Sequence, residues 1–501
     1  MNQKQALSLP EAPLRQRLAD VRDIYTERNN ANLGTRLSMA EGGCFLPPPV
    51  EVLKGFIDAA ANLGKFPHQI YPQNTALPEF IDAIHDYFTQ HCGIPLNDEE
   101  DGIVFGFGSS YIFDMLLSVI CAPGDVVLMP ESYYHSFAEW PEKWQAHAYR
   151  ICTSLDNGYK LTAADLDAWF KSNPSLAHKA KCLVLTSPTT TGAVYSREEL
   201  ESLSEIINRH GLYLYCDEVF RDTVFSGKPV ISAASIPGLK NRTITSTSGS
   251  KSRSVADLRI GWACGPKDVV DRMIWHMEHS VTEIPLYLQA VGTRIIRDID
   301  DTFLQDAANE YQQRVFMIAD LVDYSNKRLN LHFGTMNVDY IGIPYMPEAG
   351  HYICLDFQAV QGWDSRGGRK IVTGQDLCRH MYYHHHVNEK AEIINHGVCL
   401  SSGHSKGHDN FIMYLAFAQP GYEMANAASA DYARQELMRH MVTSFVKPDA
   451  TESQLQAMLS CLDLKPASPP DFKAAAISGQ REIIEAFDRI VCAIKDLKPA
   501  C

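Results

Sequence analysis

Leu212-Tyr213-Leu214-Tyr215-Cys216-Asp217-Glu218 is a short run of aliphatic and aromatic residues that ends in two carboxylates. Two comparable apolar runs precede it, at residues 126–129 and 182–185, and glycine, proline or charged residues bound them. A segment with helical spacing, residues 198–210, lies before the third run. This alternation is typical of a mostly parallel sheet whose strands are joined by crossover helices. The sequence therefore predicts an α/β fold with ligands at the carboxyl ends of the strands.

The 501 residues exceed the size of one ordinary domain. Residues 302–329 have the spacing of a helix that links a first lobe to a second. Strand-like segments at 352–357 and 411–417, with a helix near 376–386, predict a smaller α+β lobe, and helices are expected beyond Pro420. The predicted units are an N-terminal segment that joins the small domain (1–60), a large domain (61–315), a small domain (316–425) and a helical C-terminal extension (426–501). One face of the last helix is expected to carry Ile483, Ile484, Phe487, Ile490, Val491 and Ile494.

The composition is that of a well-packed protein, with 45% hydrophobic and 21% charged residues, which excludes disorder as the main state. A formal net charge of -15 argues against a nucleic-acid groove or an anionic membrane surface. Thirteen cysteines without a CxxC pair are typical of free thiols in a reducing compartment. Residues 1–17 carry charges of both signs, and no apolar run is long enough to span a bilayer. We therefore expect a cytoplasmic protein without a nucleic-acid or membrane partner.

The motif that carries most chemical information is the stretch 248–261, Ser-Gly-Ser-Lys-Ser-Arg-Ser-Val-Ala-Asp-Leu-Arg-Ile-Gly, which contains Lys251 and Arg259. A lysine with an ordinary pKa of about 10.4 is rarely neutral at pH 7, but burial beside another cation lowers that pKa. Lysines of this kind form Schiff bases. The small neighbours leave room for a ring, and their hydroxyls with Arg259 could hold a phosphate. A solvated polar loop is the alternative interpretation.

Three further motifs follow predicted strands. Gly106-Phe107-Gly108-Ser109-Ser110 precedes a helical segment, whose unpaired first amides could bind an anion, although an ordinary capped helix looks the same. Asp217-Glu218 could keep a ring nitrogen protonated, since a nearby negative charge raises the pKa of a cation. Acidic residues also commonly cap strands. Pro130-Glu131-Ser132-Tyr133-Tyr134 offers an aromatic face, which in most proteins serves packing.

Taken in order over residues 35–420, these motifs resemble those of the class I and II aminotransferases, fold type I enzymes that depend on pyridoxal 5'-phosphate. The resemblance implies a large domain with a mostly parallel seven-stranded sheet, as in aspartate aminotransferase. It implies that Lys251 is the Schiff-base lysine and that Asp217 pairs with the pyridine nitrogen. The other cofactor-binding residues that it implies are Ser109, Ser110, Ser248 and Arg259 at the phosphate and Tyr134 stacked on the ring. Tyr71 resembles a tyrosine that reaches the phosphate of the neighbouring subunit, so a homodimer is expected.

The chemistry that the resemblance implies takes place at the α-carbon of an amino acid or amine. A protonated pyridine is an electron sink, which Asp217 would maintain, and Lys251 would move the proton as general base and acid. An aminotransferase is the simplest function. A lyase, cyclase, decarboxylase or γ-substituting enzyme of a specialised biosynthetic pathway remains an alternative, because the fold cannot choose between them. A non-catalytic cofactor-binding protein is less favoured, since binding alone requires neither a proton shuttle nor an electron sink.

Two departures from the family pattern concern the 3'-oxygen of the cofactor. Residues 188–192 are Pro-Thr-Thr-Thr-Gly where the family has Asn-Pro-Thr-Gly, so Thr189 replaces an asparagine. Phe220 replaces a tyrosine three residues after Asp217. Both usual donors are therefore altered, although the Thr189 hydroxyl can still donate, and we expect Thr189 in the cofactor site.

A third departure concerns the substrate. The family clamps the substrate carboxylate with an arginine in an Arg-Leu-Ser-Phe-Ala type of run, and this chain has Tyr414-Leu415-Ala416-Phe417-Ala418. Tyrosine lacks the bidentate fork of arginine. Lys406 or His404 in the preceding loop could take over, or the substrate lacks a carboxylate there. Candidate substrate residues are thus Tyr414, Lys406 and also Gly43, which resembles part of the family's substrate-covering segment.

His384-His385-His386 looks like a metal-binding patch, but the spacing argues against one. Adjacent residues on a helix point about 100° apart and cannot all bind one ion. We interpret the three histidines as a solvated or partly packed helix end, and no metal is expected.

Overall fold

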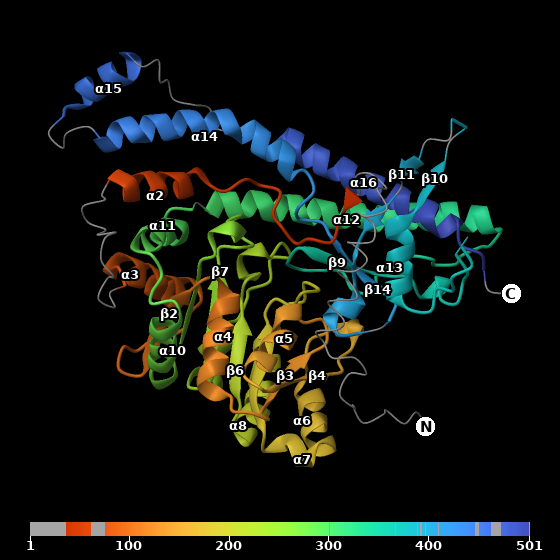
Figure 1. Cartoon of the computed structure of the whole chain (residues 1–501), viewed down its shortest axis with the longest axis horizontal. Helices are drawn as coiled ribbons and strands as arrows, with labels where there is room; N and C mark the ends of the chain where they lie inside the picture. Colours follow the sequence, from red (N-terminus) through yellow and green to blue (C-terminus); the bar gives the residue numbers. More distant parts are fainter. Residues whose placement is uncertain are drawn as a thin grey trace.

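The computed structural model describes residues 37–61, 76–299, 301–365, 367–387, 389–390, 393–395, 397–408, 410–445, 450–461 and 472–499. In Figure 1 the central sheet occupies the lower part of the molecule, long helices run across the top, and a smaller lobe lies to the right. Within these ranges no helix combines the length and the apolar character needed to cross a membrane.

The central sheet has seven strands in the order β2-β8-β7-β6-β5-β3-β4. All neighbouring strands are parallel except β8, which is antiparallel to both β2 and β7. The predicted α/β class and the mostly parallel sheet are therefore confirmed. The strands are β2 (Asp101–Gly106), β3 (Val126–Pro130), β4 (His147–Ile151), β5 (Ala180–Thr186), β6 (Tyr213–Asp217), β7 (Thr243–Ser248) and β8 (Gly261–Pro266).

Helices cover both faces of this sheet, because successive residues of a strand point to opposite faces. Val127 and Met129 of β3 lie in one core with α4 (Ser109–Ile120) and α10 (Lys267–Ser280). Val126 and Leu128 of the same strand lie in a second core with α6 (Ala163–Ser172) and α8 (Arg197–His210). The other helices of this lobe are α2 (Val50–Ala61), α3 (Pro78–Asp86), α5 (His135–Lys143), α7 (Pro174–Ala177), α9 (Pro237–Lys240) and α11 (Leu286–Arg297).

Strand β7 was not predicted, because its sequence, Thr-Ile-Thr-Ser-Thr-Ser, is mostly polar. All six residues are buried between β6 and β8. Hydrogen bonds satisfy part of this buried polar set: the Thr243 hydroxyl donates to the Leu239 carbonyl at 2.8 Å, and the Thr247 hydroxyl donates to the Glu218 carbonyl at 3.4 Å. The strand matters for function because Lys251 follows its carboxyl end.

The second lobe contains a three-stranded antiparallel sheet, β13-β14-β9. Met39 and Phe45 lie in the same core as this sheet, so the segment before α2 packs against the second lobe. The long α12 connects the lobes as predicted. The elements are β1 (Leu37–Ser38), α12 (Asp301–Phe333), β9 (Tyr352–Asp356), α13 (Gly374–Tyr383), β10 (His385–Val387), β11 (Ile393–Asn395), β12 (Val398–Cys399), β13 (Ser401–Ser402) and β14 (Ile412–Ala416).

Three helices follow β14: α14 (Tyr422–Phe445), α15 (Glu452–Cys461) and α16 (Lys473–Lys495). Figure 1 shows α16 lying along α12, while α14 continues from it above α2. Five of the six apolar residues predicted for one face of the last helix are buried, but Ile484 is 42% exposed, so that part of the prediction is wrong. The cause is geometric, since Ile484 adjoins Ile483 and points away from the packed face. The domain boundaries remain predictions, and α12 runs unbroken through residue 315.

Candidate active site

The carboxyl ends of three strands bring the predicted residues to one edge of the central sheet. Asp217 ends β6, Lys251 follows β7, and Ser109 begins α4 after β2. These strands run in one direction, because β6 is parallel to β7 while β2 and β7 are both antiparallel to β8. This edge is where α/β sheets bind ligands.

Lys251 and Asp217 influence each other's charge. Desolvation lowers the pKa of the Lys251 amine; Asp217 opposes this shift, and Arg259 adds to it. Burial raises the pKa of Asp217 to about 7, although the Val219 amide and the charge of Lys251 act in the opposite direction. Because a lower pKa makes the neutral amine more populated, Lys251 can act as a nucleophile and as a proton carrier.

The start of α4 provides an anion-binding donor set. Gly108, with φ 83°, allows the guanidinium of Arg259 to approach: a Cβ on Gly108 would stand 2.6 Å from a guanidinium nitrogen. Arg259 also donates to the Phe107 carbonyl at 3.2 Å. The first amides of a helix lack partners within it, and the Ser109 and Ser110 hydroxyls lie beside them. A guanidinium beside such amides fits a phosphate group.

Two further contacts fix the geometry of this donor set. Gly261, the first residue of β8, lies so close to α4 that a Cβ there would be 2.7 Å from the Ser109 amide nitrogen. The Tyr215 hydroxyl donates to the Ser109 carbonyl at 2.7 Å. Ser248 is buried at the end of β7, and its hydroxyl accepts from the Ser250 amide at 3.4 Å. The helix start is thus held directly by the sheet.

The residues predicted around the cofactor ring differ in their surroundings. Tyr134 is 37% exposed, and its ring lies 4.4 Å from that of His135 between centroids. The Thr189 hydroxyl is engaged within its own turn, where it lies 2.8 Å from the Thr191 hydroxyl and accepts from the Ala193 amide at 2.9 Å. Phe220 is buried and offers no hydrogen-bond donor. Tyr71 lies outside the described residues.

Tyr414 does not face solvent and is committed to two partners. Its hydroxyl donates to the Ser132 hydroxyl at 2.8 Å and lies 2.9 Å from His408 Nε2. Ser132 belongs to the loop after β3, so Tyr414 joins the second lobe to the central sheet. These two hydrogen bonds give the Tyr414 hydroxyl a structural role.

Lys406 is buried close to Lys251. It ends the short helix η8 (Gly403–Lys406), on which His404 is half-buried. Its ammonium lies 5.5 Å from the ring centroid of Tyr352 and 5.7 Å from that of Tyr414. Burial and the charge of Lys251 lower the pKa of Lys406 to about 8. No acceptor lies within hydrogen-bond distance of its Nζ in the described part of the chain, so it can bind an anion.

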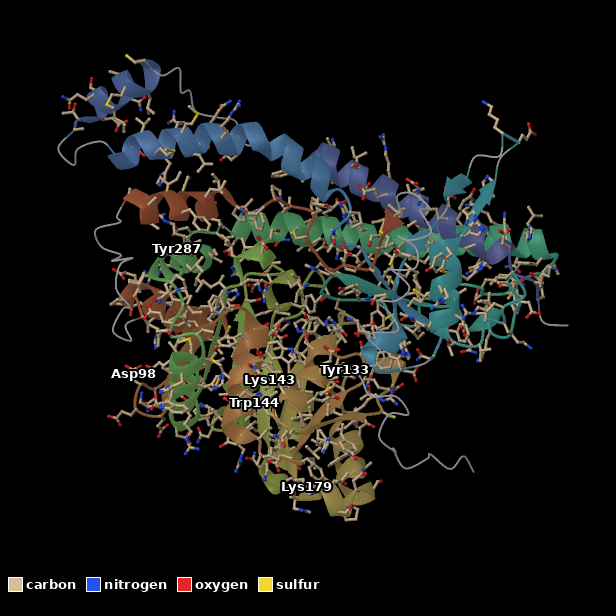
Figure 2. The ribbon with its side chains drawn as sticks, in the orientation of Figure 1. Asp98, Tyr133, Lys143, Trp144, Lys179 and Tyr287 are labelled. Carbon is tan, nitrogen blue, oxygen red and sulfur yellow. The ribbon has the colours of Figure 1, made fainter. Side chains whose placement is uncertain are left out.

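The η8 turn packs against the loop that follows β3. The Ser132 amide donates to the Lys406 carbonyl at 3.1 Å. A Cβ on Gly407 would stand 2.4 Å from the ring of Tyr133, whose place between the sheet and the second lobe is labelled in Figure 2. These contacts hold Lys406 in a fixed position relative to the strand ends.

The segment before α2 covers the site from the side of the second lobe. The Gly42 carbonyl accepts from Lys251 Nζ at 2.9 Å, and the Gly43 amide donates to Gln419 Oε1 at 3.4 Å. A Cβ on Gly42 would stand 2.5 Å from the Tyr352 hydroxyl, so this approach requires glycine. The same carbonyl accepts from Nδ1 of His351, a residue that the sequence analysis missed.

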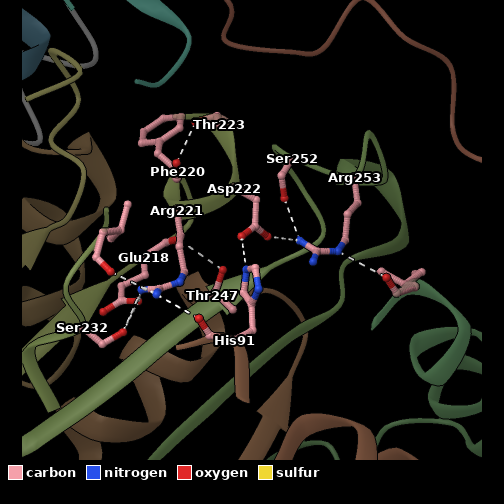
Figure 3. Close-up of polar contacts among 12 residues, drawn as sticks. His91, Glu218, Phe220, Arg221, Asp222, Thr223, Ser232, Thr247, Ser252 and Arg253 are labelled. Atoms are coloured by element: carbon pink, nitrogen blue, oxygen red, sulfur yellow. Dashed lines mark hydrogen bonds and ion pairs between the residues drawn. The ribbon is translucent and has the colours of Figure 1, made fainter. Parts of the chain in front are cut away.

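A second missed feature is a network of polar contacts around the buried side chains of Asp222, Arg253, Glu218 and Arg221, drawn in Figure 3. Arg253 forms an ion pair with Asp222, and His91 bonds the other oxygen of Asp222 at 2.7 Å. Although burial opposes it, these partners hold the pKa of Asp222 well below its usual range. Arg221 bonds Glu218 at 2.9 Å. In the sequence, the only indication of this network was that Arg253 lies two positions after Lys251.

The three adjacent histidines lie away from these residues. His384 follows the end of α13 and bonds Asp496 at 2.7 Å, while His385 and His386 lie in β10. The expected helix end is therefore correct for His384 and wrong for the other two, because a hairpin begins there. Across the described ranges, no three His, Cys, Asp or Glu residues are grouped to hold a metal.

Fold and site together define an α/β enzyme built like aspartate aminotransferase. The chain belongs to the aminotransferase class I and II family, whose model matches residues 42–392. Members of this family depend on pyridoxal 5'-phosphate.

Individual relatives are distant. An aspartate aminotransferase of Rhizobium meliloti is 25% identical over 62% of this chain and 71% of its own length. An asparagine–oxo-acid transaminase of Streptococcus mutans is 30% identical over 46% of this chain and 58% of its own. A bifunctional aspartate and glutamate/aspartate-prephenate aminotransferase of Petunia hybrida is 29% identical, and the match spans 47% of either chain. The matched region thus covers about half the length of several relatives.

Solved structures show the same fold. The aspartate aminotransferase of Rhizobium meliloti aligns over 99% of this chain and 100% of its own, with a TM-score of 0.70 and 19% identity. The aspartate aminotransferase of Thermus thermophilus with maleate aligns over 85% of this chain and 100% of its own, with a TM-score of 0.65 and 19% identity. At this identity the likeness concerns the fold alone.

Proposed function

We propose that this chain transfers amino groups between an amino acid and an α-keto acid, with Lys251 as the covalent anchor of pyridoxal 5'-phosphate. The observation that carries the proposal is the pair of Lys251 and Asp217, whose pKa values are shifted toward each other at the strand edge. Such paired shifts are characteristic of catalytic groups. Membership of the aminotransferase family supports the same conclusion.

The donor set at α4 would hold the cofactor phosphate through Ser109, Ser110, Ser248 and Arg259. When bound, the cofactor supplies an electron sink for negative charge at the substrate α-carbon. Asp217 would face the pyridine nitrogen; because a nearby cation lowers the pKa of a carboxyl, Asp217 becomes ionised in that contact.

The remaining predicted residues complete this arrangement. Tyr134 would lie against the face of the ring, and Tyr71 would reach the phosphate from the neighbouring subunit of a homodimer. Thr189 would line the ring with its methyl group, since its hydroxyl bonds within the loop. Phe220 is buried and carries no donor, so neither Phe220 nor Thr189 would donate a hydrogen bond to the 3'-oxygen of a bound cofactor.

Lys251 is the group placed to move the proton. With a lowered pKa, its amine can take the α-proton of the substrate, and the resulting ammonium can return it. The Gly42 carbonyl accepts a hydrogen bond from one N–H of this amine, and this bond orients the nitrogen and its lone pair.

We further propose that Lys406 binds the carboxylate of an amino-acid substrate. Three observations support this role: its burial, the absence of an acceptor for Nζ in the described chain, and its electrostatic contact with Lys251. The faces of Tyr352 and Tyr414 stabilise the ammonium through their ring quadrupoles without neutralising it. Gly43 would close the site over the substrate.

The test is an amino-transfer assay on the purified chain loaded with pyridoxal 5'-phosphate. Amino acids of different side-chain classes are offered with an α-keto acid acceptor, and both products are quantified. We expect one new keto acid for each new amino acid. Release of carbon dioxide or ammonia instead, without the amino acid product, would overturn transamination in favour of a decarboxylase or lyase. Lys251→Ala serves as the inactive control.

A further inference from the structure

His351 is a fully buried histidine that the proposed chemistry leaves unused. Its Nδ1 lies 2.8 Å from the Gly42 carbonyl oxygen, and Lys251 Nζ lies 2.9 Å from the same oxygen. The two side chains therefore share one acceptor. The second ring nitrogen, Nε2, is buried and has no hydrogen-bond partner among the described residues.

The protonation state of His351 follows from these contacts. Burial, together with the charge of Lys251, lowers the pKa of His351 to about 3, so the ring is neutral at physiological pH. A carbonyl oxygen only accepts hydrogen bonds, so the single ring proton must be on Nδ1. His351 is thus a fixed donor to Gly42.

The surroundings prevent the ring from turning. Phe220 and Tyr311 meet it edge-on, with centroids 5.5 and 5.3 Å away. The His351 carbonyl accepts from the Phe417 amide at 3.0 Å, which ties its backbone to the end of β14. The donor is consequently held by the core of the second lobe.

We infer that His351 is a positioning residue that orients the Lys251 amine through the Gly42 carbonyl. The hydrogen bond from His351 keeps the Gly42 carbonyl in one direction even when the Lys251 amine leaves it to react. When the amine forms its hydrogen bond to this carbonyl again, it therefore returns to the same orientation. On either side of Gly42 the segment is held by the 2.7 Å bond from the Ala416 amide to the Met39 carbonyl and by the 3.4 Å bond from the Gly43 amide to Gln419. The inference rests on the proposed function, because Lys251 must be the reacting amine.

The same carbonyl also stabilises the ammonium form of Lys251. The charged and titratable groups around this amine are Asp217, Arg259, Lys406 and His351. Of these, only His351 acts by holding an acceptor in place. Loss of its Nδ1 proton should therefore lower the pKa of the Lys251 amine and loosen its orientation.

The test compares His351→Leu with His351→Asn. Leucine fills the space without a donor. Asparagine keeps a donor, because its Nδ2 is bonded to Cγ in the same way as Nδ1 of histidine. Cofactor-free protein is mixed with pyridoxal 5'-phosphate, and covalent capture by Lys251 is followed by visible absorbance against pH. Capture requires the neutral amine, so below its midpoint we expect the leucine variant to react about 3- to 10-fold faster than the unsubstituted chain. The asparagine variant should follow the unsubstituted profile.

Steady-state kinetics provide the second measurement. The leucine variant should lose about 10- to 100-fold in kcat with little change in KM, because orientation of the proton carrier is impaired. Asparagine should restore most of the rate. Coincident capture profiles and rates for the two variants would overturn the inference, since His351 would then only fill space. Failure of the unsubstituted chain to capture the cofactor would instead contradict the proposed function.

Discussion

Lys251 and Lys406 come from opposite lobes and approach closely enough for the charge of Lys251 to help lower the pKa of Lys406 to about 8. Two lysines brought together in this way destabilise the empty site, because burial and mutual repulsion both oppose the ammonium forms. An anionic substrate group placed between them removes the repulsion. The two lysines therefore lower the stability of the empty protein and favour the binding of a carboxylate.

Lys406→Met should stabilise the cofactor-free protein at pH 7 by on the order of 1–3 kcal/mol. In the unfolded chain Lys406 keeps its proton up to about pH 10.5, whereas in the folded protein it keeps it only up to about pH 8. Raising the pH through this window therefore increases the stability of the unsubstituted protein. The advantage of methionine should accordingly shrink between pH 8 and 10.5. Thermal unfolding across that range provides the measurement.

The same variant should raise KM for an amino acid about 10- to 100-fold, because a charge-assisted hydrogen bond contributes about 1.5–3 kcal/mol. The corresponding amine, which lacks the carboxylate, should be unaffected. Lys267→Met, at an exposed position on α10, is the control. Equal losses for the acid and the amine would rule out a carboxylate contact at Lys406.

Asp217→Asn should reduce kcat at least about 100-fold, since a neutral amide cannot keep the pyridine nitrogen protonated. The variant retains an oxygen for the Val219 amide, so the fold should persist. In the cofactor-free protein, the folded carboxyl keeps its proton up to about pH 7 and the unfolded one only to about pH 3.8. The unsubstituted protein therefore loses stability as pH rises through this window, and the asparagine variant should not. Asp271→Asn, on the exposed face of α10, should leave both the rate and the pH profile of stability unchanged.

Gly261→Ala should weaken cofactor binding. The new Cβ would collide with backbone atoms of Gly108 and Ser109, and backbone cannot swing aside as a flexible side chain can. The displaced helix start would lose its alignment with the phosphate, and we expect the dissociation constant, measured by equilibrium dialysis, to rise at least tenfold, about 1.4 kcal/mol. Gly367→Ala, which meets nothing within 4 Å, is the matched control. Equal affinities for the two variants would contradict the close approach of β8 to α4.

Much of the fold could be predicted because the apolar runs that form β3, β5 and β6 are buried on both faces and lack polar interruptions. Strand β7 escaped prediction for the opposite reason: its sequence is mostly threonine and serine, although all six residues are buried. Lys251 and Asp217 could be found from the motifs around them. His351 could not, because its role depends on a carbonyl 309 positions away in the sequence.

The substrate residues show the same limit. Sequence position placed Tyr414 where the family has its arginine, but the side chain is bonded to Ser132 and His408. Lys406 was recognisable as a cation in a nearby loop. That its ammonium lies near the rings of both Tyr352 and Tyr414 depends on how the η8 turn packs against the β3 loop, which no local pattern encodes.

Tyr414→Phe separates these two roles. Removing the hydroxyl leaves Ser132 and His408 with buried groups that lose a partner, which should cost about 1–3 kcal/mol of stability. The ring that faces Lys406 remains, so KM and kcat should stay within about threefold of the unsubstituted values, because Tyr414 does not itself bind the carboxylate. Chemical unfolding and substrate kinetics on the same preparation measure both effects. Tyr324→Phe, whose side chain is 58% exposed, is the control for loss of a tyrosine hydroxyl. A large rise in KM without a loss of stability would instead make Tyr414 a direct substrate ligand and would remove the need for Lys406.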